Sequence, residues 1–137
     1  MIRIKDKVNE IHRYLEELGS IIPSTFEEYK SSIEKKAACE RYFEKIVEAM
    51  TDLAFLAIKE RKLGIPEDDI DAFKILLENK AIDNDLAAKL KNAKGMRNII
   101  SHQYGKIDDE IVFESIAEEI ARDGKKFAKE IENWLNK

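Results

Sequence analysis

Residues 33–62 read IEKKAACERYFEKIVEAMTDLAFLAIKERK and contain neither proline nor glycine. A helix over these 30 residues would be about 45 Å long at ~1.5 Å per residue. A compact chain of 137 residues has a radius of gyration of roughly 14 Å, and therefore a diameter under about 40 Å. The stretch predicts either one helix that spans the whole protein or a helix that kinks.

The composition favours helices along the rest of the chain as well. Only two Pro and five Gly occur, while Ala, Leu, Ile, Glu and Lys dominate, and these residues lose little side-chain freedom in a helix. Hydrophobic residues make up 44% and charged residues 38%, a balance typical of a soluble globular protein. We therefore expect one all-α domain over residues 1–137.

Two helical segments are predicted on the N-terminal side of this stretch. Steps of four and three residues place an apolar stripe on a first helix, which we expect Gly19 to end. Pro23 and the capping box at 24–27 then begin a second helical stretch that continues into residues 33–62. The stripe consists of Ile4, Val8, Ile11, Leu15 and Leu18.

Three further helices are predicted after Gly64. The first is short and passes through Phe73, Leu76 and Leu77. Asp83 caps the next, which extends from Leu86 to about Tyr104 before Gly105 ends it. Asp108 or Asp109 begins the last helix, and the residues expected to face inward are Ile116, Ile120, Phe127, Ile131 and Trp134 or Leu135. The pattern predicts an antiparallel bundle of about five helices.

The sequence does not support a metal-binding protein, a cofactor-binding protein or a membrane protein. Asp68, Asp69 and Asp71 lack the spacing of a calcium-binding loop, and acids at a helix start interact favourably with its dipole without any ion. Cys39 is the only cysteine, which excludes an intrachain disulfide. The charged N-terminus is unlike a signal peptide, and no apolar run reaches the ~20 residues of a membrane span. We expect no metal, no cofactor and a cytoplasmic location.

The charge is unevenly distributed along the chain. The net charge is −4, but residues 86–107 contain five basic residues and no acid, so this segment carries +5 and the remainder −9. Lys89, Lys91 and Lys94 form either a solvated helix face or a patch that attracts phosphate, and their overlap with the polar segment described next favours the patch slightly.

One residue breaks the apolar pattern of the helix at 86–104. Arg97 lies on its stripe, and a desolvated, unpaired guanidinium costs several kcal/mol. It must therefore be paired, lie where the bundle opens to solvent, or face another subunit. The stripe is made of Leu86, Leu90, Ala93, Arg97, Ile100 and Tyr104. Positions that break a local pattern are where function is sought first.

The residues around Arg97 suit metal-independent cleavage of RNA. RNA carries its own nucleophile, the 2′-hydroxyl, so an enzyme needs a group that titrates near neutral pH and a fixed cation for the charge that develops on phosphorus. His102 can move the proton and Arg97 can supply the cation, with Asn98 and Ser101 in supporting positions. The expected products are a 2′,3′-cyclic phosphate and a free 5′-hydroxyl.

Two features of this set indicate that one copy is insufficient. Arg97 and His102 are five residues apart, which is about 140° around a helix. They converge only if the helix end distorts near Gly105 or if the arginine side chain wraps around. Cleavage also needs an acid for the leaving oxygen, and the other histidine, His12, lies beside the stripe of the first helix. We predict a homodimer that brings two copies of Arg97 and His102 into one cleft.

The segment RNIISHQY at residues 97–104 resembles the Arg-x4-His-x-Tyr motif of the HepT-like branch of HEPN domains. Residues 41–52, 95–98 and 107–113 also resemble the pattern of that family. The resemblance implies a dimerising helical bundle, a metal-independent endoribonuclease centred on Arg97 and His102, and a toxin role in a toxin–antitoxin pair. It further implies a minimal nucleotidyltransferase partner that neutralises the toxin by transferring AMP from ATP onto Tyr104.

Two other interpretations remain open from the sequence. In one, the chain is a non-catalytic helical partner or nucleotide-binding module of a nucleotidyltransferase. In the other, it is a plain helical bundle in which Arg97 forms a salt bridge across the core to Glu44 or Glu48. Asn98 has two roles open to it, since it either orients His102 from one turn below or caps a local backbone group.

Overall fold

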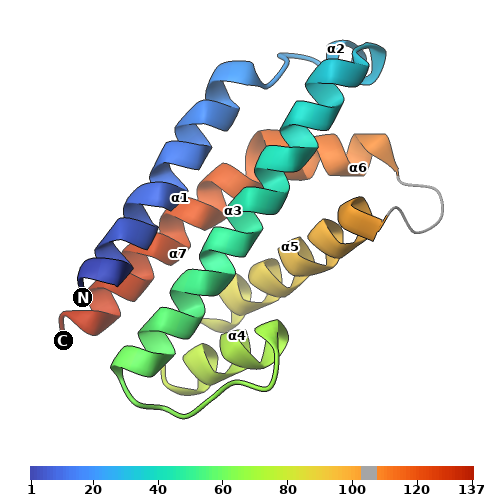
Figure 1. Cartoon of the computed structure of the whole chain (residues 1–137). Coiled ribbons are helices and arrows are strands. Elements are labelled where there is room, and N and C mark those ends of the chain that lie inside the picture. Colours follow the sequence, from blue (N-terminus) through green and yellow to red (C-terminus); the bar gives the residue numbers. More distant parts are fainter. Residues whose placement is uncertain (103–107) are drawn as a thin grey trace.

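The computed structural model describes residues 1–102 and 108–137, and every regular element within these ranges is helical. This confirms the all-α prediction (Figure 1). In chain order the elements are α1 (Ile2–Ile21), α2 (Phe26–Ser31), α3 (Ile33–Glu60), α4 (Asp69–Glu78), α5 (Asn84–His102), α6 (Asp109–Glu114), a π-helical turn η1 (Ser115–Glu119) and α7 (Ile120–Leu135).

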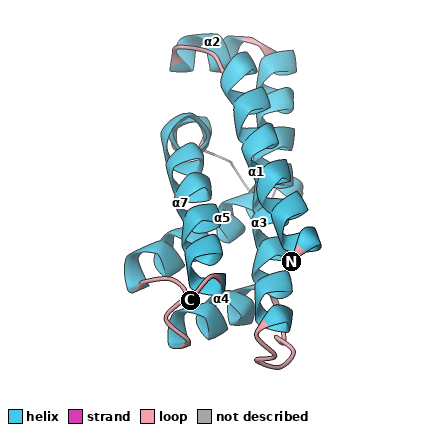
Figure 2. Cartoon of the chain, turned by 90° about the vertical axis from the view of Figure 1, so that its left-hand side faces the viewer, coloured by secondary structure: helices cyan, strands magenta, loops and turns pink. Residues whose placement is uncertain are grey.

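Helix α3 is the central element of the bundle. It is one uninterrupted helix of 28 residues, as residues 33–62 predict, and it contacts α1, α2, α4, α5, η1 and α7. The Ser32 hydroxyl caps its start by accepting a hydrogen bond from the backbone N–H of Lys35. The short helices α2 and α4 lie at opposite ends of the bundle in two perpendicular views (Figures 1 and 2).

The start of the chain departs from the sequence prediction at two points. Helix α1 continues through Gly19 to Ile21, and it ends because the proline ring at position 23 favours the extended backbone that Ile22 adopts, with ψ at 131°. Ser32 is also extended and separates α2 from α3, so the predicted second stretch is two helices. Thr25 caps α2 and accepts a hydrogen bond from the N–H of Glu28.

Helices α5 and α6 begin at the predicted capping residues. The Asp83 carboxylate accepts a hydrogen bond from the N–H of Leu86 at 2.8 Å, and Asp108 accepts from two backbone N–H groups at the start of α6. The last predicted helix is divided, because the π-helical turn η1 separates α6 from α7. The predicted helix end at Gly105 lies outside the described residues.

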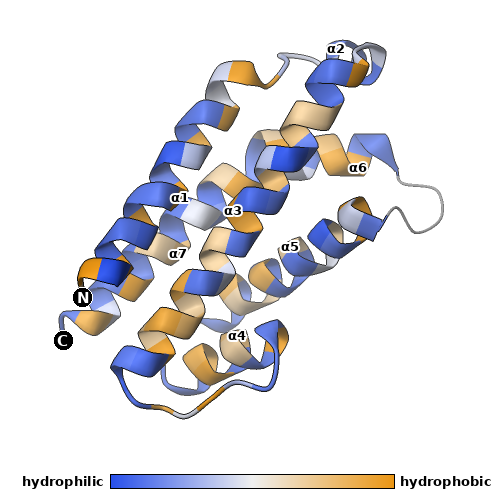
Figure 3. Ribbon diagram, viewed as in Figure 1, coloured by the Kyte–Doolittle hydropathy of each residue, from blue (hydrophilic) through white to orange (hydrophobic). Residues whose placement is uncertain are grey.

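The buried side chains of these helices form one hydrophobic cluster. Its members include the whole predicted stripe of α1 and the residues predicted to face inward from the last helix, with Trp134 buried and Leu135 only partly so. In Figure 3 the outward side of α1 is largely hydrophilic. Helix α5 differs from the others: Leu86, Leu90 and Ile100 are buried, whereas Ala93 and Arg97 are half-buried. The core is therefore incomplete beside the C-terminal half of α5.

None of the helices in the described part of the chain has the length and apolarity required to cross a membrane.

Candidate active site

The C-terminal half of α5 faces α3 through polar side chains. The Arg97 guanidinium donates a hydrogen bond from Nη2 to Glu48 Oε1 at 2.6 Å. The Arg97 side chain is 22% exposed and that of Glu48 43%. Two of the conditions expected for Arg97 therefore hold together, because it is paired with an acid and lies where the bundle opens to solvent. The pairing is also the contact that the plain-bundle interpretation anticipated.

A second contact joins α5 to α3 one turn further along. The Ser101 hydroxyl donates to Glu44 Oε2 at 2.8 Å, and Glu44 is also 3.9 Å from Nη1 of Arg41. Glu40, Glu44 and Glu48 are four residues apart and share one side of α3. Helix α3 therefore presents an acidic row at this end of α5, which we call the α3 acidic row.

Burial raises the pKa of the Glu40 carboxyl at the far end of this row. Lys36 opposes the increase, while the carboxylates of Asp109 and Glu44 add to it. Lys36 is itself 2.8 Å from the Asp109 carboxylate, which ties α3 to the first residue of α6. An anionic ligand would be repelled by the α3 acidic row, so a phosphate must approach Arg97 from the solvent side.

Asn98 lies beside Arg97, and its Oδ1 accepts a long hydrogen bond of 3.4 Å from Arg97 Nη1. Arg97 Nε is buried and has no hydrogen-bond partner among the described residues. The guanidinium is therefore held at its two terminal nitrogens by Glu48 and Asn98. The contact made by Asn98 places it next to the cation, which is a second way for it to support the site besides the predicted orientation of His102.

His102 is the last residue of α5 and is exposed to solvent. The helix is α-helical from Arg97 through His102, so the two residues are about 140° apart around its axis. The described part of α5 does not contain the distortion that would bring them together within one copy. Tyr104, the remaining predicted site residue, lies outside the described residues.

The lysines of α5 are partly neutralised by neighbouring acids. Lys94 is 2.5 Å from the Asp69 carboxylate and Lys89 is 2.9 Å from that of Asp85. Asp69 belongs to the acidic start of α4, where Asp68 accepts from the N–H of Asp71. These acids thus serve as a cap and an ion pair, and the described residues contain no cluster of three or more metal-ligating side chains.

Fold and site together define a helical bundle with a polar Arg-x4-His segment at the end of one helix, in the manner of HEPN proteins. The model of the Ribonuclease HepT-like family matches residues 11–131, and the chain belongs to this family.

Individual relatives extend this similarity across most of the chain. It is 33% identical to a candidate RNase of Archaeoglobus fulgidus over 128 residues, which are 91% of this chain and 95% of that one. It is 28% identical to the tRNA nuclease HepT of Aphanizomenon flos-aquae over 114 residues, or 83% of this chain and 78% of the relative. The structure matches the tri-AMPylated HEPN toxin of Shewanella oneidensis, solved in complex with its MNT antitoxin, with a TM-score of 0.88, 25% identity, and coverage of 95% and 96%.

Proposed function

We propose that this chain is a metal-independent endoribonuclease toxin whose active cleft is formed by Arg97 and His102 of two copies. The observation that carries the proposal is the placement of Arg97 on an otherwise apolar face of α5, held by Glu48 at 2.6 Å. His102 follows it at the exposed end of the same helix. In the proposed reaction Arg97 is the fixed cation and His102 is the proton carrier, which agrees with membership of the Ribonuclease HepT-like family.

The reaction needs two proton transfers. One His102 removes the proton of the ribose 2′-hydroxyl while the 2′-oxygen attacks phosphorus. The bond between phosphorus and the 5′-oxygen breaks, and the leaving oxygen receives a proton from the protonated His102 of the second copy. Arg97 stabilises the negative charge that accumulates on the phosphoryl oxygens. The products are a 2′,3′-cyclic phosphate and a 5′-hydroxyl end.

The proposal of a homodimer with a shared cleft follows from the positions of the two histidines. His12 is exposed on α1 and borders a hollow with Ala121 and Lys125 of α7. It therefore belongs to a different pair of helices from Arg97. A two-fold axis at the end of α5 would bring two copies of His102 to one phosphate, and it would cover the exposed side chain of Ile99.

Glu48 acts in this proposal as a positioning residue for Arg97. Replacing Glu48 by alanine is expected to lower the rate of RNA cleavage about tenfold, because a misplaced cation stabilises the transition state less well. Glu48→Gln keeps a hydrogen-bond acceptor and should recover part of the rate. The unfolding temperature should change little in either variant, since the carboxylate is 43% exposed. Single-turnover cleavage of a labelled RNA measures the effect.

Glu34→Ala is the matched control, because Glu34 is an exposed acid on the same helix. A Glu48→Ala protein as fast as the parent would show that Arg97 needs no carboxylate to hold it.

We further propose that a minimal nucleotidyltransferase neutralises this toxin by modifying Tyr104, as the S. oneidensis complex of an AMPylated toxin with its antitoxin suggests. The phenolic oxygen would attack the α-phosphorus of ATP, with loss of pyrophosphate and of the phenolic proton. The added phosphate would then pair with the Arg97 guanidinium, and the nucleoside would block the path of the RNA.

Tyr104→Phe is expected to abolish AMP addition and leave RNA cleavage within about twofold of the parent, because the phenol oxygen has no part in the proposed proton transfers. Intact mass spectrometry of protein produced with its nucleotidyltransferase measures the added AMP. A mass increase of AMP units on the variant would place the modification elsewhere.

The proposed activity is tested with tag-free protein and labelled RNA in the presence of EDTA. We expect cleavage that leaves cyclic phosphate ends. Absence of cleavage on several RNAs, together with retained tight binding to the nucleotidyltransferase, would contradict the proposal and favour a non-catalytic partner. We propose that residues 1–137 act as one domain in the cytoplasm, where RNA is available and the buried thiol of Cys39 stays reduced.

A further inference from the structure

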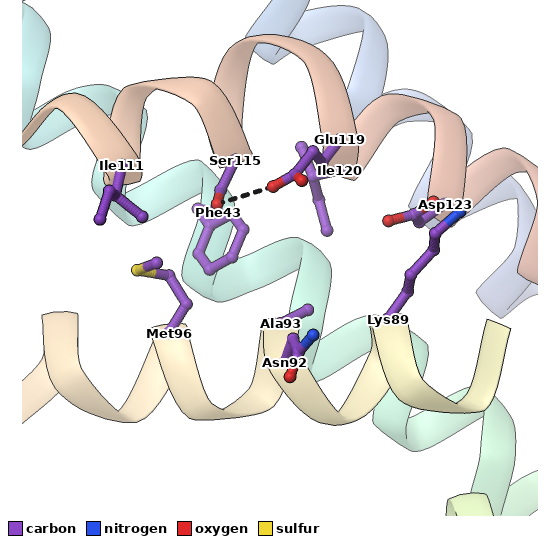
Figure 4. A pocket seen from close by; sticks show the side chains of 10 residues that line it. All are labelled: Phe43, Lys89, Asn92, Ala93, Met96, Ile111, Ser115, Glu119, Ile120 and Asp123. Atoms are coloured by element: carbon purple, nitrogen blue, oxygen red, sulfur yellow. Dashed lines mark hydrogen bonds between the residues drawn. The ribbon is translucent and has the colours of Figure 1, made fainter. Parts of the chain in front are cut away.

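A cavity of about 220 Å³ lies between α5 and the segment formed by η1 and the start of α7. Phe43 of α3 forms its floor and is 1% exposed. Figure 4 shows Met96 and Asn92 of α5 on one side of this space. The volume is below the roughly 300–1,000 Å³ of sites for drug-sized ligands, so the cavity suits one flat ring system.

The π-helical turn shapes one wall of this cavity. Ser115 and Glu119 are its first and last residues, and both side chains point into the space between the helices in Figure 4. The Ser115 hydroxyl donates to Glu119 Oε1 at 3.0 Å, which fixes the carboxylate at the rim. Single π-helical turns interrupt α-helices at some cost and are frequent at functional sites. The turn thus supplies a positioned hydrogen-bond acceptor.

A second acceptor lies deeper in the cavity. The residue Asp123 is 6% exposed, one of two buried polar residues among those described. Its Oδ1 accepts a hydrogen bond from Nε of Arg122 at 3.0 Å. Arg122 is exposed and does not line the cavity. Lys89 also borders the cavity but is 2.9 Å from Asp85. The lining therefore has carboxylate oxygens in excess of available cations.

The side chains that line the cavity favour the base of a nucleotide over its phosphate. A phosphate would be repelled by the carboxylates of Glu119 and Asp123. A neutral ring can pack against the apolar side chains of Phe43 and Met96 while its exocyclic amino group donates to a carboxylate. Asn92 offers an amide at the opposite wall, suited to the paired donor and acceptor of a base edge.

We propose that this cavity binds one base of the RNA substrate, and that it selects cytosine or adenine over uracil through their exocyclic amino groups. The inference rests on the proposed ribonuclease activity and adds a specificity-determining site to it. Met96 directly precedes Arg97 in α5. The two side chains leave α5 about 100° apart, with Met96 facing the cavity and Arg97 facing Glu48 of α3. A nucleotide whose base lies beside Met96 would extend its backbone around α5 toward the phosphate-binding cation.

Methionine methyl groups provide a direct probe of base binding. The chain has three methionines: Met96 lines the cavity, and Met1 and Met50 do not. In protein labelled at its methionine methyl groups, the shift of the Met96 signal on titration reports binding. The dissociation constant for CMP is expected to be at least about fivefold lower than that for UMP, which carries a carbonyl where CMP carries an amino group. The signals of Met1 and Met50 should stay unchanged.

The second arm maps cleavage sites on a randomised RNA. The parent protein should prefer cytosine or adenine at one fixed position beside the cut. Asp123→Asn, whose amide can donate to a uracil carbonyl, should reduce that preference at least about fivefold. Ala93→Phe, which fills the cavity, should reduce it as well. Glu118→Gln removes a neighbouring exposed acid that does not line the cavity, and it should keep the preference.

The two arms separate failure of this inference from failure of the proposed function. Absence of a Met96 shift with CMP overturns the base site whether or not RNA is cut. An unchanged base preference in both Asp123→Asn and Ala93→Phe overturns it too, even if CMP binds, because the cavity would then serve a free nucleotide. A protein that cuts no RNA contradicts the ribonuclease proposal, while the Met96 signal still reports on the cavity.

Discussion

Replacing His102 by alanine is expected to reduce RNA cleavage about 10³-fold, because the proposed reaction loses its base and its acid together. General acid–base catalysis by a positioned side chain contributes about 10²–10⁴-fold to a rate, and in a shared cleft the substitution removes two such groups. His102 is exposed at the end of α5, so the variant should keep the circular dichroism and unfolding temperature of the parent.

His12→Ala is the matched control for this experiment. It removes the other histidine of the chain, which is exposed on α1, and should leave cleavage within about twofold of the parent. If His102→Ala cuts RNA at the parental rate, His102 carries no proton in the reaction and the catalytic assignment is wrong.

Arg97→Ala is expected to lower the cleavage rate about 10²–10³-fold, the usual loss when one group that stabilises transition-state charge is removed. Arg97→Lys should recover only part of this, because an ammonium cannot reproduce the planar fork that a guanidinium offers to phosphate. The Glu48 carboxylate left behind is 43% exposed, so the variant should fold. Single-turnover rates with saturating RNA separate the loss in chemistry from any loss in binding.

The role of Arg97 in the chemical step would be contradicted if the substitution changed RNA binding but not the single-turnover rate. If Arg97→Ala weakened RNA binding but left the single-turnover rate at saturation unchanged, Arg97 would bind the substrate without stabilising the transition state.

Much of the fold could be predicted from periodicity and capping residues. The uninterrupted stretch at 33–62 corresponds to α3, and Asp83 and Asp108 cap the helices expected to follow them. These features are local, since an apolar stripe or a cap depends on residues within a turn or two of the chain.

The predicted helix boundaries were wrong where two sequence signals compete. Gly19 weakens a helix without stopping it, and α1 ends only where Pro23 favours an extended backbone at Ile22. The break at Ser32 lies at a residue type that is favoured at helix starts, but one serine within a helical pattern does not by itself predict a break. The π-helical turn at 115–119 carries no mark in the sequence. Both the break and the turn depend on how α2 and α6 pack on the rest of the bundle.

The candidate site was indicated by one broken rule, the arginine on the apolar stripe of α5. One interpretation of the sequence paired this arginine with Glu44 or Glu48, and Glu48 is the one that it contacts. The contact between Ser101 and Glu44 and the cavity beside Met96 were not predicted. Both depend on the rotation of α5 against α3 and α7, which is set by tertiary packing and not by spacing along one helix.

The central claim, that two copies share one site, is tested most directly by mixing active and inactive subunits. Parent and His102→Ala chains are produced together at equal amounts, so that they assort into dimers at random. If a cleft needs His102 from both copies, only parent homodimers cut RNA, and activity falls to roughly a quarter of that of an equal total amount of parent protein. Activity of roughly one half would show that each chain works alone and would contradict the shared cleft.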